Sequence, residues 1–201
     1  MKLIKIVITG GPCAGKSEAM TWIKNTFTKE GYGVIFVSET ATELITGGIA
    51  PWTMKSPFIY QLYQMRLQIE KEKIYCSAAE NILQHDKVII VFDRGMADNL
   101  GYMSSEDFNK ALKLLNINDV YSRYDAVFHL VTAAKGARED YTTDNNLART
   151  ETPDEAAALD DRLINAWKPH QNFNMIDVSD NFCDKMRCLI EKISIFLEEN
   201  M

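Results

Sequence analysis

The stretch Gly-Gly-Pro-Cys-Ala-Gly-Lys-Ser at residues 10–17 satisfies the complete pattern G-x-x-x-x-G-K-[ST] of a phosphate-binding loop, or P-loop. An apolar, β-branched run at residues 3–9 precedes it, and an amphipathic helical pattern follows it to about Lys29. Strand, glycine-rich loop and helix in this order form the context in which the motif binds nucleotide phosphates. A chance glycine turn is therefore the weaker interpretation.

The residue types of the loop explain the predicted chemistry. Glycines allow backbone N–H groups to face the β-phosphate, and the helix N-terminus adds the positive end of its dipole. We expect Lys16 to reach the β- and γ-phosphate oxygens and the Ser17 hydroxyl to ligate Mg²⁺. Cys13 is interpreted as a small packing residue rather than a redox switch. The predicted ligand is ATP or GTP with Mg²⁺, and its predicted contacts are Gly10, Gly11, Pro12, Cys13, Ala14, Gly15, Lys16, Ser17 and Glu18.

Short apolar runs alternate with longer helical patterns along the whole chain, which is typical of an α/β fold with a parallel sheet. We expect a single domain over residues 1–201 that has three layers and a central five-stranded parallel sheet. The predicted strands are 3–9, 33–38, 87–92, 126–131 and 173–178. After the P-loop helix, the predicted helices are 57–84, 105–115, one that starts at a capping box at 152–155, and 182–198.

Ligands of open α/β sheets bind beyond the carboxyl ends of the strands, and charged residues follow two of the predicted strands. Glu39 is predicted to accept a proton from an acceptor hydroxyl or to hold Mg²⁺ through water; the alternative is an acid that stabilises a helix N-terminus. Asp93 follows a Walker-B-like run and is predicted to bind the Mg²⁺ hydration shell. Arg94 is predicted to bind a phosphate or the acceptor, and the alternative is a structural Asp93–Arg94 pair.

Residues 133–151 form a polar, charged stretch directly after the fourth predicted strand, and we expect a lid there. A lid arginine would stabilise the charge of the transferring phosphoryl group, and lid closure would exclude water. Arg149 is favoured because it lies just before a well-capped helix. For Lys135 and Arg138 a solvated loop is the stronger interpretation, and Arg162 is a weaker candidate on the helix.

The segment 45–66 combines aromatic and amide side chains, and two interpretations are equally open. It forms an acceptor pocket beside the P-loop, or the helix packs its aromatic stripe into the core. The residues concerned are Gly47, Gly48, Pro51, Trp52, Pro57, Phe58, Tyr60, Gln61, Tyr63, Gln64 and Arg66.

The overall composition is that of an acidic globular protein, with 46% hydrophobic residues, 25% charged residues and a net charge of −6. A protein whose main role is to hold DNA or RNA is usually basic, so a nucleic-acid partner is disfavoured. The four cysteines include no C-x-x-C pair, and no apolar run approaches the roughly 20 residues of a membrane span. We expect a cytoplasmic protein that binds a nucleotide and a small-molecule acceptor. The oligomeric state stays open, with a homodimer among the options.

Several of these stretches together resemble the AAA_28 family of AAA-domain P-loop proteins, over nearly the whole chain. The resemblance is carried by residues 8–17, 38–42, 92–95, 141–146 and 148–151, and the last two are the most diagnostic. Relatives in this group include ribosylnicotinamide kinase domains and a module that binds GTP and phosphoinositides. A looser similarity to nucleoside and nucleotide kinases implies a kinase-like core.

The resemblance implies a catalytic set of Lys16, Glu39, Asp93, Arg94 and Arg149, with Ser17 and Asp93 at the metal. The leading hypothesis is a small-molecule kinase that transfers a γ-phosphoryl group with Mg²⁺. The alternative is a nucleotide-dependent switch or binding module with slow hydrolysis. The sequence leaves ATP and GTP both open because it contains no Asn-Lys-x-Asp guanine motif.

Overall fold

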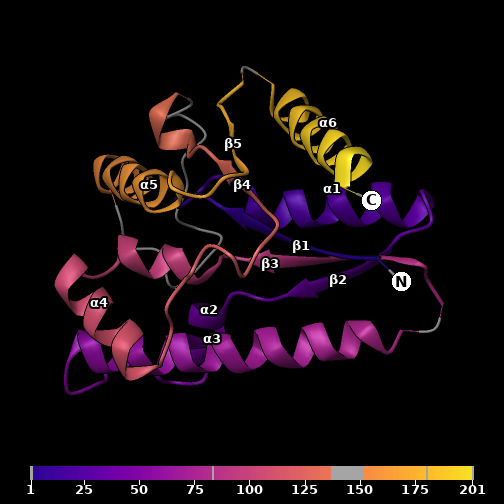
Figure 1. The fold of residues 1–201 in the computed structure, drawn as a ribbon. Helices are drawn as coiled ribbons and strands as arrows, with labels where there is room; N and C mark the ends of the chain where they lie inside the picture. Colours follow the sequence, from indigo (N-terminus) through magenta and orange to yellow (C-terminus); the bar gives the residue numbers. More distant parts are fainter. Residues whose placement is uncertain (1, 83, 137–151, 180, 201) are drawn as a thin grey trace.

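The computed structural model describes residues 2–82, 84–136, 152–179 and 181–200. Its centre is a five-stranded parallel sheet in the order β2-β3-β1-β4-β5 (Figure 1). The strands are β1 (Lys2–Thr9), β2 (Gly33–Val37), β3 (Lys87–Asp93), β4 (Ala126–Leu130) and β5 (Phe173–Ile176). The predicted α/β fold with five parallel strands is therefore confirmed.

The long helices also follow the predicted pattern, and three short ones add to it. The long helices are α1 (Lys16–Lys29), α3 (Pro57–Glu80), α4 (Ser105–Leu114), α5 (Pro153–Trp167) and α6 (Phe182–Asn200). The short ones, for which we predicted no bounds, are α2 (Thr40–Thr46) and the 3₁₀ helices η1 (Met96–Gly101) and η2 (Ala133–Lys135). Only the alternative interpretation of Glu39 implied a helix at the position of α2. The prediction that the helix starting at residue 57 reaches residue 84 is wrong, because α3 ends at Glu80, where Asn81 caps it and the Asn81 Nδ2 donates to Ser77 O at 2.8 Å.

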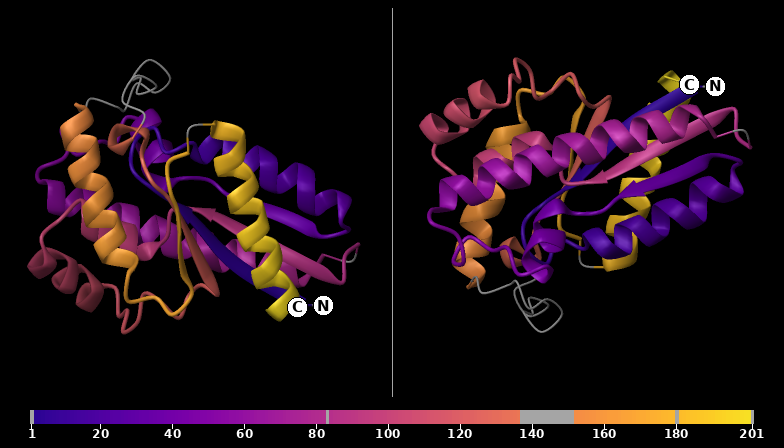
Figure 2. Two further views of the ribbon diagram at one scale, coloured as in Figure 1. Left: turned by 90° about the horizontal axis from the view of Figure 1, so that it is seen from above. Right: turned by 90° about the horizontal axis from the view of Figure 1, so that it is seen from below.

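Helices cover both faces of the sheet, and alternate strand residues point to the two layers. On one face, Ile6 and Ile8 of β1 pack in a cluster with α1 and α6. On the other face, Val7 of β1 and Ile90 of β3 belong to a cluster that includes residues of α3, α4 and α5. Figure 2 shows α1 and α6 close together on one side of the sheet and α3 on the opposite side. Burial on both faces explains why these strands are continuous apolar runs.

The strand order brings together, at the carboxyl ends of the strands, three segments that contain predicted site residues. β3 lies between β2 and β1, with Val37 paired to Phe92 and Ile8 paired to Asp93. Because all three strands run parallel, their carboxyl ends meet at the same edge of the sheet. The P-loop, Glu39 and Arg94 each follow one of these strand ends.

None of the helices in the described part of the chain is long and apolar enough to cross a membrane.

The start of α5 has the predicted capping box, which yields a test of stability. Glu155 N donates to Thr152 Oγ1 at 3.3 Å, and Thr152 N donates to Glu155 Oε2 at 2.8 Å. Thr152→Ala should lower the free energy of unfolding by about 1 kcal/mol, because the first turn loses its side-chain acceptor. Thr152→Ser keeps the hydroxyl and should unfold like the wild type in urea, followed by circular dichroism. Equal losses in both variants would contradict the stabilising role of the capping hydroxyl.

Candidate functional site

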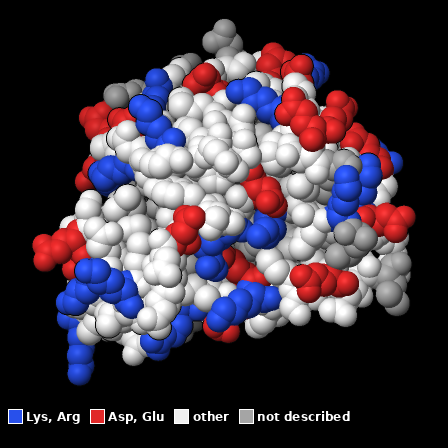
Figure 3. All heavy atoms as spheres, in the orientation of Figure 1, with Lys and Arg blue, Asp and Glu red and all other residues white. Residues whose placement is uncertain are grey.

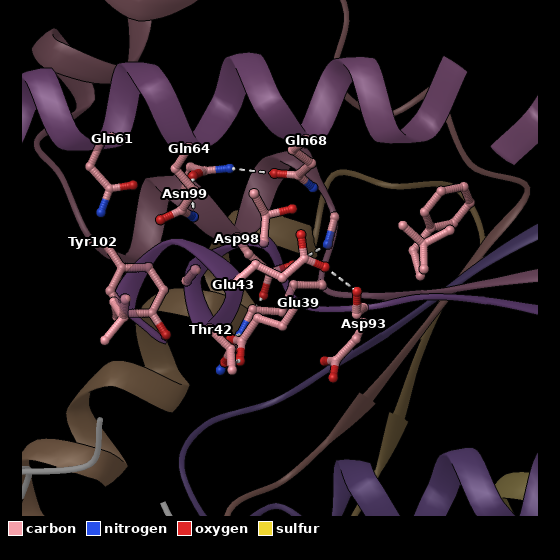
Figure 4. A pocket seen from close by; sticks show the side chains of 18 of the residues that line it. Glu39, Thr42, Glu43, Gln61, Gln64, Gln68, Asp93, Asp98, Asn99 and Tyr102 are labelled. Carbon is pink, nitrogen blue, oxygen red and sulfur yellow. Dashed lines mark hydrogen bonds and ion pairs between the residues drawn. The ribbon is translucent and has the colours of Figure 1, made fainter. Parts of the chain in front are cut away.

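A cavity of about 510 Å³ lies at the carboxyl edge of β1, β2 and β3. It is bounded by the P-loop, by α2, by one face of α3 and by η1 (Figure 4). Its volume is in the range of small-molecule binding sites. Six of the predicted site residues line it, namely Pro12, Lys16, Ser17, Glu39, Asp93 and Arg94.

The P-loop has the backbone that its glycines predict. Gly10 has a φ of 144°, and a Cβ there would lie 2.2 Å from the carbonyl oxygen of Leu130, so only glycine fits. Gly15 has a φ of 89° and stands at the N-cap of α1, where no described side chain caps the helix. A helix N-terminus of this kind is suited to binding an anion through its first N–H groups. Lys16 Nζ donates to Gly10 O at 3.2 Å and to Gly11 O at 3.3 Å.

The outer side of the P-loop is hydrogen-bonded by residues from the second half of the chain. Gly11 N donates to Asp160 Oδ1 of α5 at 2.8 Å, and Lys185 Nζ of α6 donates to Ala14 O at 2.9 Å. The Thr132 hydroxyl donates to the carbonyl of Pro12. These hydrogen bonds fix the backbone of the P-loop. The sequence analysis did not identify Asp160 or Lys185 as part of the site.

Lys185 is a buried amine directly beneath the loop. Burial lowers its pKa to about 8, with the nearby charges of Asp160 and Lys16 acting in opposite directions. Its Nζ also donates to Val131 O at 2.7 Å. Lys185 thereby joins the P-loop to the end of β4.

The Asp160 carboxylate contacts two further side chains besides the Gly11 N–H of the P-loop. Its Oδ1 also contacts His129 Nε2 at 3.0 Å, and its Oδ2 lies 2.8 Å from Lys135 Nζ. Burial raises the pKa of Asp160, but the contacts from His129 and Lys135 and the Gly11 N–H outweigh burial and lower it to about 2. Lys135, which the sequence placed in a solvated lid, instead pairs with Asp160 and with Asp161 at 2.7 Å.

Glu39 and Arg94 form an ion pair across two strand ends. Arg94 has a left-handed backbone, with a φ of 67°, and its Nε donates to Glu39 Oε1. Thr42 Oγ1 donates to Glu39 Oε2 at 2.7 Å. Burial raises the pKa of Glu39, but the charges of Arg94 and Lys16 outweigh it and lower the pKa to about 2. Glu39 is therefore a carboxylate at neutral pH; it also stands at the N-cap of α2, as its alternative interpretation predicted.

Asp93 lies at the end of β3 and lines the same cavity. Its Oδ1 is buried and accepts no hydrogen bond from any residue in the described ranges. Burial raises the pKa of Asp93; the charge of Lys16 opposes this shift and that of Glu39 adds to it. Arg94 pairs with Glu39 and Asp98 rather than with Asp93, so the structural Asp93–Arg94 pair does not form. A buried carboxylate oxygen without a partner is suited to a cation or to its hydration shell.

Asp98 of η1 is a residue of this site that the sequence analysis missed. Its Oδ1 lies 3.2 Å from Arg94 Nη1 and accepts from the Thr9 hydroxyl. Its Oδ2 accepts from Gly95 N at 2.8 Å and from Trp167 Nε1 at 2.9 Å. Asp98 thereby positions Arg94. The available signal was the spacing of four residues between the two, which is typical of an ion pair along a helical turn.

The segment 45–66 satisfies both of its interpretations in part. Gln61 and Gln64 line the cavity, whereas Met65 of the same helix packs in the core beneath the sheet. Arg66 is exposed and does not line the cavity. Other residues of the segment that line the cavity are Ile45, Pro51, Trp52 and Tyr60.

Some predicted residues lie elsewhere. Arg138 and Arg149 lie outside the described residues. Arg162 Nε donates to Gly101 O at 2.9 Å and so supports η1. Glu18 is exposed on the first turn of α1.

The donor set fits a nucleotide with Mg²⁺. The P-loop offers a glycine cradle and an uncapped helix N-terminus, and Asp93 offers an unpartnered carboxylate oxygen within the described residues. In the parts of the chain that the structure describes, no group of three or more His, Cys, Asp and Glu side chains could hold a metal ion by itself. A Mg²⁺ ion bound here would therefore take further ligands from phosphate oxygens and water.

Charges are mixed on the face drawn in Figure 3, where basic and acidic side chains of the described residues lie interspersed. Among these residues, that face presents no continuous basic surface.

The fold and the loop define a P-loop nucleotide-binding protein of the α/β class. A family model described as an AAA domain, AAA_28, matches residues 5–185, and the chain belongs to this family. No curated protein matches the chain.

The contacts of Asp160 predict a pH-dependent stability. Asp160→Asn should lower the free energy of unfolding by about 2–3 kcal/mol at pH 7, because His129, Lys135 and Gly11 lose a charged, buried partner. Because the pKa of Asp160 is lower in the folded state than in the unfolded chain, its carboxylate stabilises the fold above about pH 4. This stabilisation is lost as the pH falls toward about 2, where the folded-state carboxylate becomes protonated. The Asn variant should lack this part of the pH dependence.

Asp161→Asn is the matched control, because Asp161 pairs with the same lysine at an exposed position. This variant should change the free energy of unfolding by less than about 1 kcal/mol in urea titrations from pH 2 to 7. Similar losses in both variants would show that the contacts behind the P-loop are not what Asp160 contributes.

Proposed function

We propose that the protein is a kinase that transfers the γ-phosphoryl group of ATP or GTP to a hydroxyl group of a small acceptor. The observation that carries this proposal is the cavity, which connects Lys16 and Ser17 of the P-loop with the Glu39 carboxylate and with a polar wall on α3. A triphosphate seated on the P-loop would present its terminal phosphate to this space. An acceptor in the cavity would then lie in reach of that phosphate.

The P-loop residues and Asp93 would hold the donor. Lys16 would leave the carbonyls of Gly10 and Gly11 and bind the β- and γ-phosphate oxygens. Ser17 and the unpartnered oxygen of Asp93 would hold Mg²⁺ and its hydration shell. Bound Mg²⁺ would supply charge neutralisation on the phosphates.

Glu39 would orient the acceptor and take its proton. The acceptor oxygen forms a bond to the γ-phosphorus while the bond from that phosphorus to the bridging oxygen breaks, and the electron pair stays on the nucleoside diphosphate. The hydroxyl proton passes to the Glu39 carboxylate and from there to water. A pKa near 2 makes Glu39 a weak base that is always ionised, which suits proton transfer late in a loose transition state. Arg94, held by Glu39 and Asp98, adds positive charge beside the transferring group.

The alternative function is a nucleotide-dependent switch. A switch would present a shallow face opposite the terminal phosphate, whereas the described residues line a ligand-sized cavity beside the P-loop. This contrast supports the kinase.

Lys16→Ala should abolish nucleotide binding and leave the fold intact, because the variant loses the point charge on the β- and γ-phosphates. Titration with fluorescent ATP and GTP analogues measures binding, and circular dichroism measures the fold. Millimolar or tighter affinity retained by the variant would refute the assignment of the P-loop.

Glu39→Gln should lower acceptor-dependent turnover by about 10²- to 10⁴-fold, because the amide cannot take the proton. The variant also loses the charge that pairs with Arg94, but it keeps the P-loop, so the nucleotide affinity should change far less than the turnover. The assay follows nucleoside diphosphate release with ATP and GTP across nucleosides, nucleotides and ribosylnicotinamide. Glu70→Gln, an exposed change on α3, serves as the control. If no acceptor stimulates turnover of the wild type, the kinase proposal fails and the switch is favoured.

A further inference from the structure

One wall of the cavity carries amide groups that the proposed phosphoryl transfer does not use. Gln61, Gln64 and Gln68 project from one face of α3 into the region shown in Figure 4. Each of these residues is at most 8% exposed. A buried amide is unfavourable unless its hydrogen-bonding groups are satisfied, so this wall needs partners.

A hydrogen-bonded network fixes two of the three amides. Gln64 Nε2 donates to Asn99 Oδ1 at 3.0 Å, and Asn99 Nδ2 donates to Gln68 Oε1 at 3.2 Å. Asn99 itself is held by a second bond from its Nδ2 to Met96 O at 3.0 Å. The bond from its nitrogen to Asn99 fixes the orientation of the Gln64 amide, and no hydrogen bond to its carbonyl oxygen is seen from the described residues.

Gln61 is the unsatisfied member of this wall. Its Oε1 is buried and has no hydrogen-bond donor among the residues that the structure describes. The neighbouring Tyr60 hydroxyl is also buried and has no partner within the same ranges. Burial, together with the charge of Glu39, raises the pKa of Tyr60 to about 12, and both residues line the cavity. The Gln61 oxygen can only accept a hydrogen bond, so it calls for a ligand that donates one, whereas the Tyr60 hydroxyl can either donate or accept.

The spacing of the Gln61 and Gln64 side-chain carbonyls indicates which kind of hydrogen-bond donor the ligand carries. Residues three apart on a helix have Cβ atoms about 5–6 Å apart, so one small group can contact both Gln61 and Gln64. An –NH₂ group carries two hydrogens and can donate to both oxygens. Trp52 and Tyr102 also line the cavity, and the Arg94 guanidinium lies 5.8 Å from the centre of the Tyr102 ring. Aromatic side chains of this kind pack well against a planar ring. In the amide orientation of the structure, an –NH₂ group on a planar ring can donate to both glutamine oxygens, whereas a ring carbonyl at the same position can donate to neither.

We propose that Gln61 and Gln64 bind the –NH₂ group of a planar heterocycle in the acceptor and reject the analogue that has oxygen at the same position. This inference rests on the proposed function in placing the acceptor in the cavity. To the proposed kinase function, the inference adds the chemical group of the acceptor that is recognised and the two residues that recognise it.

The test measures binding alone, by titration calorimetry with the full chain and without a phosphate donor. The probes are matched neutral pairs in which the ring –NH₂ is replaced by oxygen: adenosine and inosine, and cytidine and uridine. In at least one pair the amino member should bind at least about tenfold more tightly, since its analogue leaves the buried oxygens unpaired.

Gln61→Leu has a similar size and no amide, so it should reduce this preference to less than about threefold. Gln61→Met, which is unbranched and a good helix former, should do the same and serves as the second variant if Leu disturbs α3. Gln171→Leu is the matched control, because it removes an exposed glutamine outside the cavity and should keep the preference.

Equal binding within every pair, tighter binding of the oxygen analogue, or no binding of any probe would overturn the inference. These outcomes are distinguishable from failure of the proposed function. A preserved amino preference without phosphoryl transfer would contradict the kinase alone, whereas phosphoryl transfer without the preference would contradict the role of Gln61 and Gln64 alone.

Discussion

The P-loop keeps its shape because the side of its backbone that faces away from the cavity is hydrogen-bonded by later parts of the chain. Asp160 accepts from Gly11, Lys185 donates to Ala14, and Thr132 donates to Pro12. These contacts come from helices on both faces of the sheet and from the end of β4. A loop held in this way needs little further ordering when it binds phosphates, so less of the binding free energy is lost to conformational entropy.

A second constraint acts at the neighbouring strand ends. Arg94 adopts a left-handed backbone that costs about 1–2 kcal/mol, and it is held there by a backbone bond from its N–H to Ile8 O at 3.0 Å and by Glu39 and Asp98. Strain of this kind is maintained where surrounding contacts determine the geometry. The pair of Glu39 and Arg94 thereby keeps both charges at the cavity, between the P-loop and the amide wall of α3.

The elements that were predictable have local signals. Continuous apolar runs identified all five strands, and the capping box at Thr152 placed the start of α5, because both depend on neighbouring residues only. The bounds of α2 and η1 were not predicted because these helices have 7 and 6 residues, too few for a helical period to be recognised. The same shortness concealed Asp98 and Asn99, which η1 directs toward the cavity.

The sequence by itself determined the P-loop, the parallel α/β class and the presence of Glu39, Asp93 and Arg94 at strand ends, since these follow from short patterns along the chain. Only the tertiary structure decided which groups meet. Asp160 reaches Gly11 across 149 residues, and Lys185 reaches Ala14 across 171 residues. Such partners are chosen by the packing of helices on the sheet. For the same reason, only the folded cavity distinguishes the satisfied amide of Asn99 from the unsatisfied oxygen of Gln61.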